Sequence, residues 1–288
     1  MGTGAVAGQV AVITGAGRGL GEAYAKAFAA EGAAVVVNDI DGVSAERVAA
    51  WIVAGGGRAV AHAAAVGTED TAEALVAKAV DAFGGIDVMI TNAGADRRGS
   101  VFDLTTDDWM FTLQTHLFGT IHCAIAAARR MREQGRGGSI ITVVSDAFHM
   151  GLEGLGPYGT AKGGIYGYTR TLALELAHVD INVNAVAPPM TQTPPVDEFL
   201  QSRVEAGAPE GELEFFRSTI QQPEEVALVT VFLASERARG LHGEVFTMTR
   251  DSLAMLRPVG ARTAHTDAAW TVDGLAAAAA ELAGGSGA

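Results

Sequence analysis

The stretch Thr14-Gly15-Ala16-Gly17-Arg18-Gly19-Leu20-Gly21 (TGAGRGLG) joins a short apolar run, residues 9–14, to a helical pattern over residues 19–32. Gly15, Gly19 and Gly21 permit a tight turn, a bare backbone beside a pyrophosphate, and close packing of the helix on the strand. The amino end of that helix offers N–H groups and a positive dipole to an anion. In a chain with 37 glycines an ordinary strand–helix turn is the alternative. The strand before and the helix after favour a dinucleotide-binding turn.

Apolar runs of strand length alternate with helical patterns along the rest of the chain. Further strands are predicted at residues 33–39, 58–66, 86–91, 139–145, 181–187 and 244–248, and helices at 44–54, 69–83, 106–133, 158–177 and 223–234, with Ser44 as the N-cap of the first of these helices. Strands that are apolar along their whole length are buried on both faces. The pattern therefore predicts an α/β fold: a Rossmann-type, doubly wound parallel sheet of about seven strands with helices on both faces.

The domain organisation follows from two segments that break this alternation. We expect one Rossmann-type domain over residues 1–259 and a C-terminal tail over 260–288, in which residues 275–282 are helix-prone. Residues 189–222 are long, polar and interrupted by prolines, and they follow the carboxyl end of a predicted strand. Such a segment is typical of a lid or substrate loop, although an ordinary helical excursion is the alternative.

Composition excludes several classes of partner. The 288 residues include 20 Lys and Arg against 33 Asp and Glu, a formal net charge of −13. An acidic chain repels nucleic acid and anionic membranes, so neither is expected as a partner. A single cysteine, Cys123, excludes an internal disulfide framework, and the dispersed histidines predict no metal site. We found no targeting or membrane-spanning segment, and we expect a cytoplasmic protein.

The residue that ends the second predicted strand indicates the dinucleotide. Asp39 lies 18 residues after Gly21. An aspartate at this place accepts hydrogen bonds from the adenosine ribose and repels a 2′-phosphate, which favours NAD over NADP. Arg18 is the counter-argument, since its guanidinium can meet a 2′-phosphate.

Three further residues have the chemistry for moving a proton. Tyr158 and Lys162 lie four positions apart at the start of a predicted helix, and so face the same way. Ser145 ends the fifth predicted strand, at the sheet edge where a ligand crevice forms. A tyrosine titrates near ~10, and a nearby lysine cation lowers its pKa towards neutrality. A surface helix pair is the alternative for Tyr158 and Lys162 taken alone.

Taken together, these motifs resemble the short-chain dehydrogenase/reductase family over about residues 8–248. The matching motifs are TGAGRGLG, Thr91-Asn92-Ala93-Gly94, Ser145 and Tyr158-Gly159-Thr160-Ala161-Lys162. The resemblance implies that Tyr158 is the catalytic acid and base, that Lys162 lowers its pKa and binds the nicotinamide ribose, and that Ser145 orients the substrate. It implies cofactor binding by Gly15, Arg18, Gly19, Leu20, Gly21, Asp39, Asn92, Ala93, Gly94, Tyr158, Lys162, Pro188 and Thr193. Dimers or tetramers are common in the family, so a homo-oligomer is expected.

Four departures from the family pattern stand out. His116 replaces an asparagine that holds a water in a proton relay, and we expect the imidazole, which binds water and titrates near neutrality, to serve the same relay. The alternative is a helix histidine with no proton role. Ala65 replaces an aspartate that contacts adenine. Pro188-Pro189 replaces Pro-Gly, and Thr249-Arg250-Asp251 replaces a glycine-rich end.

The function predicted is an NAD(P)-dependent oxidoreductase that interconverts a secondary alcohol and a ketone on a hydrophobic small molecule. The candidate substrate-binding residues are Ser145, Asp96, Phe148, His149, Met150, Leu152 and Met190. Several short sequences, among them VVVND and HLFGT, resemble 3-hydroxyacyl-CoA dehydrogenase domains of multifunctional β-oxidation enzymes, so a 3-hydroxyacyl thioester dehydrogenase is one alternative. A non-redox relative (epimerase, dehydratase or cyclase) and a cofactor-binding regulatory protein are the others.

Overall fold

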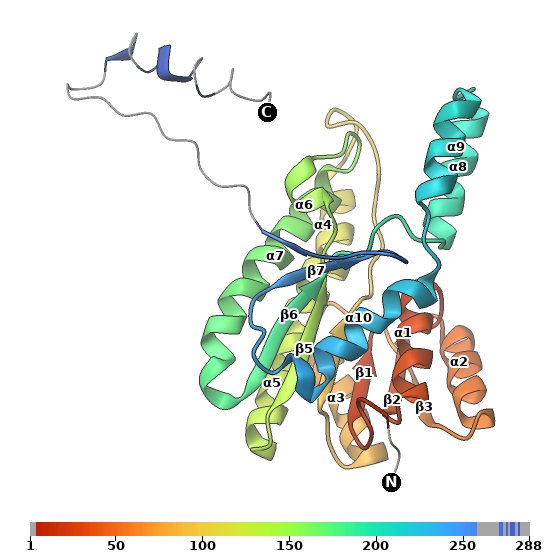
Figure 1. The fold of residues 1–288 in the computed structure, drawn as a ribbon, viewed down its shortest axis with the longest axis vertical. Helices are drawn as coiled ribbons and strands as arrows, with labels where there is room; N and C mark the ends of the chain where they lie inside the picture. Colours follow the sequence, from red (N-terminus) through yellow and green to blue (C-terminus); the bar gives the residue numbers. More distant parts are fainter. Residues whose placement is uncertain (1–3, 258–270, 273–274, 276, 280–281, 283–288) are drawn as a thin grey trace. The chain divides into compact units, whose positions relative to one another are not determined.

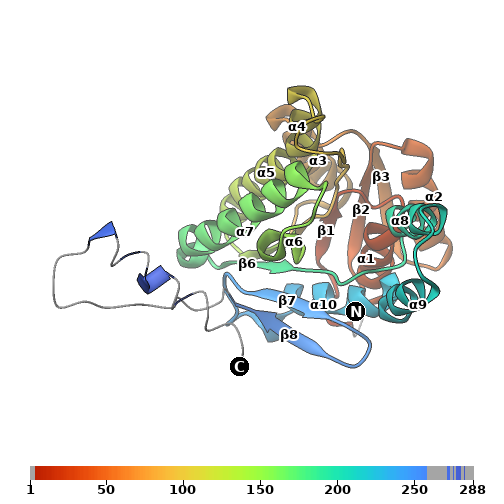
Figure 2. The same cartoon turned by 90° about the horizontal axis from the view of Figure 1, so that it is seen from above.

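The computed structural model describes residues 4–257, 271–272, 275, 277–279 and 282. It divides into two units, residues 1–256 and 257–288. The first unit is built on one eight-stranded sheet with the strand order β3-β2-β1-β4-β5-β6-β7-β8 (Figures 1 and 2). The strands are β1 (Val10–Ile13), β2 (Ala34–Asp39), β3 (Arg58–Ala63), β4 (Val88–Thr91), β5 (Gly138–Val143), β6 (Ile181–Val186), β7 (Val245–Met248) and β8 (Leu253–Leu256).

Strands β1 to β7 pair in parallel, which confirms the predicted doubly wound sheet. The eighth strand was not predicted. It pairs antiparallel with β7 at the edge of the sheet, and its residues are mostly exposed, so it lacks the apolar burial pattern of the others. Residues Thr249-Arg250-Asp251, where the family has a glycine-rich end, lie in the connection that reverses the chain between β7 and β8.

Successive residues of each strand pack on opposite faces of the sheet. In β1, Ala11 and Ile13 join a core with helices α1 (Gly19–Ala30), α2 (Gly42–Ala54) and α10 (Pro223–Ala234). Val10 and Val12 join a second core with α3 (Glu69–Phe83), α5 (Gly119–Gln134) and α7 (Gly156–Leu176). Helices therefore cover both faces, as Figure 2 shows, and the apolar strand sequences are explained by burial on both sides.

Local sequence signals set most of the helix ends. Thr68 and Thr71 form a capping box at the start of α3, and Gly84 ends that helix with a φ of 86°. For α2 the predicted cap was wrong: the Asp41 carboxylate accepts the amide hydrogens of Val43 and Ser44, so the helix begins before Ser44.

The long helix predicted over residues 106–133 is interrupted. It consists of α4 (Thr106–Leu113), a π-helical turn over Gln114–Phe118, and α5. His116 lies in the π-helical turn. Such turns in helices are frequent at functional sites, because the extra residue changes the direction of side chains.

The segment predicted as lid-like contains two helices, α8 (Pro194–Glu205) and α9 (Glu210–Thr219). In Figure 1 they stand above the edge of the sheet at which the parallel strands end, as does the short helix α6 (Ala147–Met150). In the second unit, the described residues 272, 275, 277–279 and 282 are helical, in agreement with the predicted helical run. The remainder of the predicted tail lies outside the described residues.

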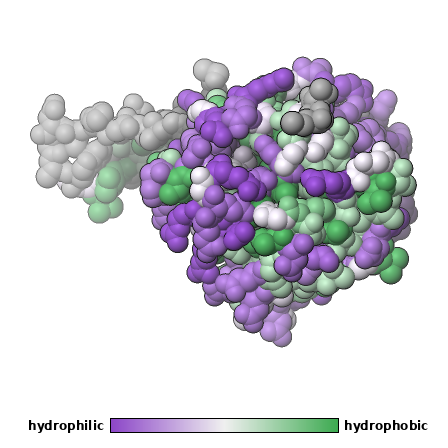
Figure 3. All heavy atoms as spheres, turned by 90° about the horizontal axis from the view of Figure 1, so that it is seen from below, coloured by the Kyte–Doolittle hydropathy of each residue, from purple (hydrophilic) through white to green (hydrophobic). Residues whose placement is uncertain are grey.

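The opposite end of the first unit carries hydrophobic residues interspersed with hydrophilic ones (Figure 3). Within the described part of the chain, no helix combines the length and apolar character needed to cross a membrane.

Candidate active site

The carboxyl ends of the parallel strands bring the predicted residues to one edge of the sheet. Asp39 is the last residue of β2, Asn92 follows β4, and Ser145 follows β5 by two residues. A cleft of about 300 Å³ opens there. The predicted cofactor-binding residues that line it are Gly15, Arg18, Gly19, Leu20, Gly21, Asp39, Asn92, Ala93, Gly94 and Thr193. Among the described residues its lining does not include Pro188, Ser145, Tyr158 or Lys162.

The glycine turn leaves no room for side chains. Gly15 and Gly19 adopt φ angles of 62° and 56°, a region that favours glycine. A Cβ on Gly21 would lie 2.1 Å from the Gly15 carbonyl oxygen, and one on Gly15 would lie 2.8 Å from the Ala93 Cα. The backbone of this turn is therefore bare towards the cleft, and α1 begins at Gly19 with its amide groups directed to the turn.

Strand β4 holds the turn in place. The Thr14 hydroxyl accepts the amide hydrogens of Asn92 and Ala93, both at 3.0 Å. The Asn92 side-chain amide donates to the carbonyl oxygens of Thr14 at 3.0 Å and Gly15 at 3.2 Å. The Asn92 side chain thus holds the turn by donating to two main-chain carbonyl oxygens of the turn, which explains why an amide side chain is needed at this position.

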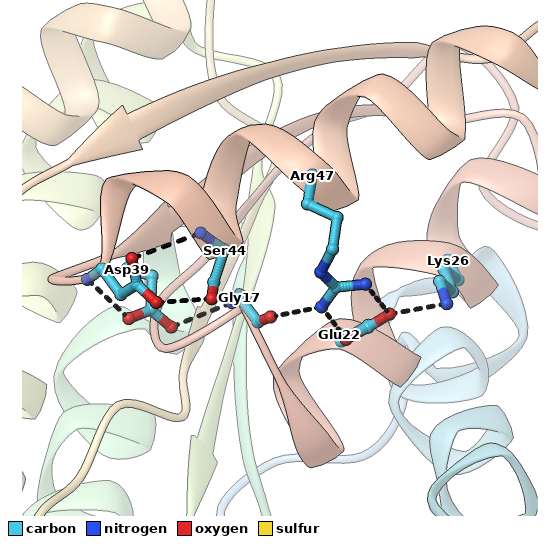
Figure 4. Close-up of polar contacts among 7 residues, drawn as sticks. Gly17, Glu22, Lys26, Asp39, Ser44 and Arg47 are labelled. Atoms are coloured by element: carbon cyan, nitrogen blue, oxygen red, sulfur yellow. Dashed lines mark hydrogen bonds and ion pairs between the residues drawn. The ribbon is translucent and has the colours of Figure 1, made fainter.

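Asp39 is buried beside the turn, with 8% of its surface exposed. Its two carboxylate oxygens accept the amide hydrogens of Gly17, at 2.9 Å, and Asp41, at 3.0 Å (Figure 4). A carboxylate oxygen has more than one acceptor position, so both oxygens retain capacity for ribose hydroxyls. The negative charge stays fixed at the end of β2, where the cleft passes.

Sequence reasoning missed most of the far wall of the cleft, of which it had singled out only Ala65. Its members come from β2 and the residue after it, the loops after β3 and β4, helix α4, the π-helical turn and helix α8: Asn38, Ile40, Ala64, Ala65, Val66, Ala95, Phe111, Thr115, Pro194 and Pro195. Because β2 and β3 are adjacent parallel strands, the residues that follow β3 could have been expected near Asp39 at the end of β2. No local pattern marks Phe111, in α4, or Thr115, in the π-helical turn, because only the tertiary fold brings these two elements to the cleft.

A second group of residues adjoins the cleft at Gly94. Tyr158 and Lys162 lie in the first turns of α7, and the Ser145 hydroxyl lies near enough to the Tyr158 phenol to lower its pKa. The Lys162 ammonium lies 5.5 Å from the centre of the Tyr158 ring. His116 packs edge-on against the same ring with 5.3 Å between centres. A Cβ on Gly94 would lie 2.0 Å from the His116 Cε1, so Gly94 makes space for the imidazole.

The pKa of Tyr158 differs from our expectation. Burial raises the pKa of this phenol, and the nearby Ser145 hydroxyl lowers it by a smaller amount. Lys162 does not lower it here, because the amine, buried and donating to the Val143 carbonyl at 2.7 Å, has a pKa of about 7 and is uncharged where the phenol titrates. Burial also lowers the pKa of Lys162 to about 7, so this residue loses charge near neutral pH.

His116 is buried and uncharged. It is 6% exposed, and neither ring nitrogen has a hydrogen-bond partner in the described part of the chain. Burial, followed by the charge of Lys162, holds the pKa of His116 well below 6.5. The expectation that this histidine titrates near neutrality is therefore wrong: desolvation favours the neutral imidazole, which carries one donor and one acceptor.

The structure places the predicted substrate residues in different surroundings. Asp96 acts electrostatically on both Tyr158 and Lys162, which places its carboxylate near the reacting group. Phe148 instead stacks on Tyr166 with 4.5 Å between ring centres, as a packing residue does. Met190 is half-buried, and the three residues His149, Met150 and Leu152 are exposed.

Three arginines near this edge, Arg97, Arg98 and Arg203, are paired with carboxylates. Arg98 pairs with Asp96 at 2.8 Å, and Arg203 pairs with Glu212 at 2.6 Å. Arg97 lies 3.9 Å from Asp108, with its guanidinium over the Phe111 ring. Binding of a polyphosphate such as coenzyme A through these arginines would have to displace the carboxylates.

A smaller pocket, of about 160 Å³, lies at the amino edge of the sheet. Its charged residues are also paired, Arg136 with Asp87 at 2.8 Å and Arg239 with Asp180 at 3.1 Å. Within the residues described, no group of three or more His, Cys, Asp or Glu side chains is arranged to hold a metal ion. The cleft at the carboxyl edge is thus the candidate active site.

A dinucleotide-type turn beside a serine, a tyrosine and a lysine on one Rossmann-type sheet defines a class of cofactor-dependent oxidoreductases. A family model described as enoyl-(acyl carrier protein) reductase matches residues 15–249. The chain is 37% identical over 245 residues to (2S)-[(R)-hydroxy(phenyl)methyl]succinyl-CoA dehydrogenase subunit BbsD of Thauera aromatica, covering 82% of this chain and 93% of that protein. It is 36% identical over 247 residues to 3-oxoacyl-[acyl-carrier-protein] reductase of Synechocystis, covering 85% and 96%.

Solved structures agree. A short-chain dehydrogenase from Mycobacterium avium superposes with a TM-score of 0.82 at 30% identity, over 98% of this chain and 96% of that one. 7α-Hydroxysteroid dehydrogenase complexed with NADH and 7-oxo glycochenodeoxycholic acid gives a TM-score of 0.74 at 28% identity, over 85% and 94%. The chain belongs to the short-chain dehydrogenase/reductase family, and it is an oxidoreductase of the kind that binds NAD or NADP.

Proposed function

We propose that this protein interconverts a secondary alcohol and a ketone on a hydrophobic small molecule, with NAD preferred to NADP. The observation that carries the proposal is the contact between the two halves of the site: Gly94 lines the cleft and packs directly on His116, which touches Tyr158. A cofactor seated in the cleft would therefore end beside a phenol, a hydroxyl and an amine. A protein that only binds a nucleotide would not need this set of three side chains.

The residues of the cleft fit a nicotinamide dinucleotide. The four glycines of the turn, at residues 15, 17, 19 and 21, present no side chain to a pyrophosphate, and the amino end of α1 favours its charge. Asp39 suits the adenosine ribose. When bound, the nicotinamide ring supplies or accepts the hydride at the reacting carbon.

This chain's own residues move the proton and hold the substrate. Ser145 donates a hydrogen bond to the substrate oxygen, and Tyr158 gives its proton to that oxygen in reduction and takes it back in oxidation. The raised pKa of Tyr158 keeps the phenol protonated and suits it to reduction. Lys162, with a pKa of about 7, exchanges protons near neutral pH and restores the proton to the phenol. A hydrogen bond from Ser145 that is already in place, and Tyr158 as a proton donor beside it, lower the activation barrier of the reaction without large motions of the protein.

Cofactor preference gives the first prediction. NADH should bind and react at least tenfold better than NADPH, because a 2′-phosphate would approach the buried carboxylate of Asp39. Titration of the protein's fluorescence with each cofactor measures the two dissociation constants. Tighter binding of NADPH would show that Arg18 determines the preference in place of Asp39.

His116 gives the second prediction. We propose that its neutral imidazole holds a water that connects Lys162 to solvent, accepting at one nitrogen and donating at the other. His116→Ala should lower turnover by on the order of 10- to 100-fold, whereas His116→Asn, which also holds a water, should retain most of it. Turnover should show no histidine titration between pH 6 and pH 8, since the imidazole stays neutral. Unchanged turnover of His116→Ala across pH would exclude the relay.

The substrate class is tested with a panel that follows NADH absorbance in both directions. Hydrophobic ketones, steroid alcohols and 3-hydroxyacyl thioesters belong in it, the last because the relatives include enzymes named for acyl thioesters. We expect turnover with uncharged hydrophobic ketones. If only acyl-CoA substrates reacted, the 3-hydroxyacyl thioester alternative would replace our proposal.

A further inference from the structure

The middle residue of the glycine turn is held at both ends of its backbone. The Gly17 amide donates to the Asp39 carboxylate at 2.9 Å, and the Gly17 carbonyl accepts from the Arg47 guanidinium at 2.8 Å. Arg47 comes from α2, and its side chain reaches from that helix to the Gly17 carbonyl (Figure 4). The turn that faces the cleft is thereby clamped between a buried carboxylate and a cation.

Arg47 is itself held by Glu22, in the first turn of α1. The two terminal nitrogens of Arg47 donate to the two oxygens of Glu22, at 3.0 and 2.6 Å. The ammonium of Lys26 lies 2.7 Å from Glu22 and 4.5 Å from the centre of the Trp51 ring. Glu22 is largely buried, with 17% of its side chain exposed, while 54% of the Arg47 side chain is exposed. The Arg47 charge consequently lies at the surface beside the turn, neutralised by Glu22.

We propose that Glu22 and Arg47 are positioning residues that set the cofactor preference of this site: Glu22 holds Arg47 on the Gly17 carbonyl, and so keeps a guanidinium away from a 2′-phosphate. The inference rests on the proposed function, in that the turn binds a nicotinamide dinucleotide. A guanidinium that donates to both oxygens of a carboxylate, as Arg47 does to Glu22, is also well suited to bind a phosphate. Without Glu22, Arg47 is an exposed guanidinium held by the Gly17 carbonyl alone, and the Gly17 amide in turn donates to the Asp39 carboxylate.

The balance of charge around the turn supports this role. Glu22, Asp39 and Asp41 are acidic, and Arg18, Lys26 and Arg47 are basic. A 2′-phosphate adds negative charge beside Asp39, which one released guanidinium would offset. The hydrogen bond to Gly17 meanwhile stabilises the turn for any dinucleotide, so Arg47 contributes to NADH binding as well.

Five variants of the full chain separate these roles: Glu22→Gln, Arg47→Ala, Arg47→Lys, the double variant of Glu22→Gln and Arg47→Ala, and Glu46→Gln as a control that removes a negative charge next to Arg47 in sequence. Dissociation constants for NADH and NADPH are measured by fluorescence titration, with thermal unfolding to verify folding. Glu22→Gln should improve NADPH binding relative to NADH by about fivefold or more. Arg47→Ala should weaken NADH binding about three- to tenfold, and Arg47→Lys should recover part of that loss.

The double variant is decisive. If released Arg47 meets the 2′-phosphate, the gain for NADPH disappears when Arg47 is also removed. If the gain persists in the double variant, or if Glu46→Gln shows the same gain, only general charge repulsion is involved and the inference is overturned. No change of the NADPH-to-NADH ratio in a folded Glu22→Gln also overturns it. Failure of the proposed function looks different, since the wild-type protein would then consume no NADH with any ketone of the panel, whatever the NADPH-to-NADH binding ratio of the variants.

Discussion

Tyr158→Phe should reduce turnover by a factor of about 10³ or more and leave the dissociation constant for NADH within about twofold of wild type. The substitution removes one oxygen atom, the atom that we propose gives its proton to the substrate. The ring contact with His116 is retained, so the packing of the site changes little. Steady-state turnover of a substrate found in the panel, together with fluorescence titration of NADH, measures the two effects.

The matched control for this variant is Tyr166→Phe, four residues beyond Lys162 on α7. The Tyr166 ring stacks on Phe148, and its hydroxyl has no partner among the residues that the structure describes. Turnover of Tyr166→Phe should stay close to wild type. Retention of more than about one tenth of the wild-type rate by Tyr158→Phe would show that another group supplies the proton.

Lys162→Met should abolish most of the turnover and yet stabilise the protein without cofactor. Burial lowers the pKa of Lys162 from 10.5 to about 7, so holding it charged in the folded state costs on the order of 3–5 kcal/mol. Methionine fills a similar volume without that cost, but it leaves the Val143 carbonyl without its donor, a loss of about 1–3 kcal/mol. We expect a net gain of about 1–3 kcal/mol in the free energy of unfolding at pH 7.

The sign of the pH dependence follows from the same shift. Between pH 7 and about 10 the unfolded chain keeps its proton on Lys162 while the folded protein releases it, so wild-type stability rises with pH through this residue. The advantage of Lys162→Met should therefore shrink from pH 7 to pH 9. Denaturant unfolding at the two pH values measures it. If Lys162→Met were less stable than the wild type at both pH values, the surroundings of the ammonium would fully offset the cost of burying its charge.

Most of the fold was accessible from sequence because its elements carry strong local signals. Strand β1 and the first four residues of β2 are apolar, the glycine turn has a steric reason for each glycine, and capping residues mark helix ends. Strand β8 could not be predicted, since its exposure at the sheet edge removes the burial pattern. The π-helical turn was missed for a similar reason: Gln114–Phe118 continues the helical periodicity, and one extra residue per turn leaves no mark in composition.

The sequence predicted the places of the site residues better than the direction of their pKa shifts. Strand ends placed Asp39, Asn92 and Ser145 together, as topology requires. The ionisation of Tyr158, Lys162 and His116 depends on burial, which arises from contacts between α7, the π-helical turn and β5. Sequence spacing contains no measure of that burial, and so the direction of the Tyr158 shift was missed. The Glu22–Arg47 pair, 25 residues apart, was likewise invisible until α1 and α2 were placed side by side.

The most direct test is transfer of deuterium from the cofactor to the product. NADH carrying deuterium at both positions of nicotinamide C4 is incubated with the wild-type protein and a ketone that the panel identifies, and the alcohol is analysed by mass spectrometry. Hydride transfer at this site predicts one deuterium on the carbinol carbon of each product molecule and one NAD formed for each. Consumption of NADH that yields no alcohol carrying deuterium at that carbon would contradict it, because the hydride from nicotinamide C4 would then not reach the ketone.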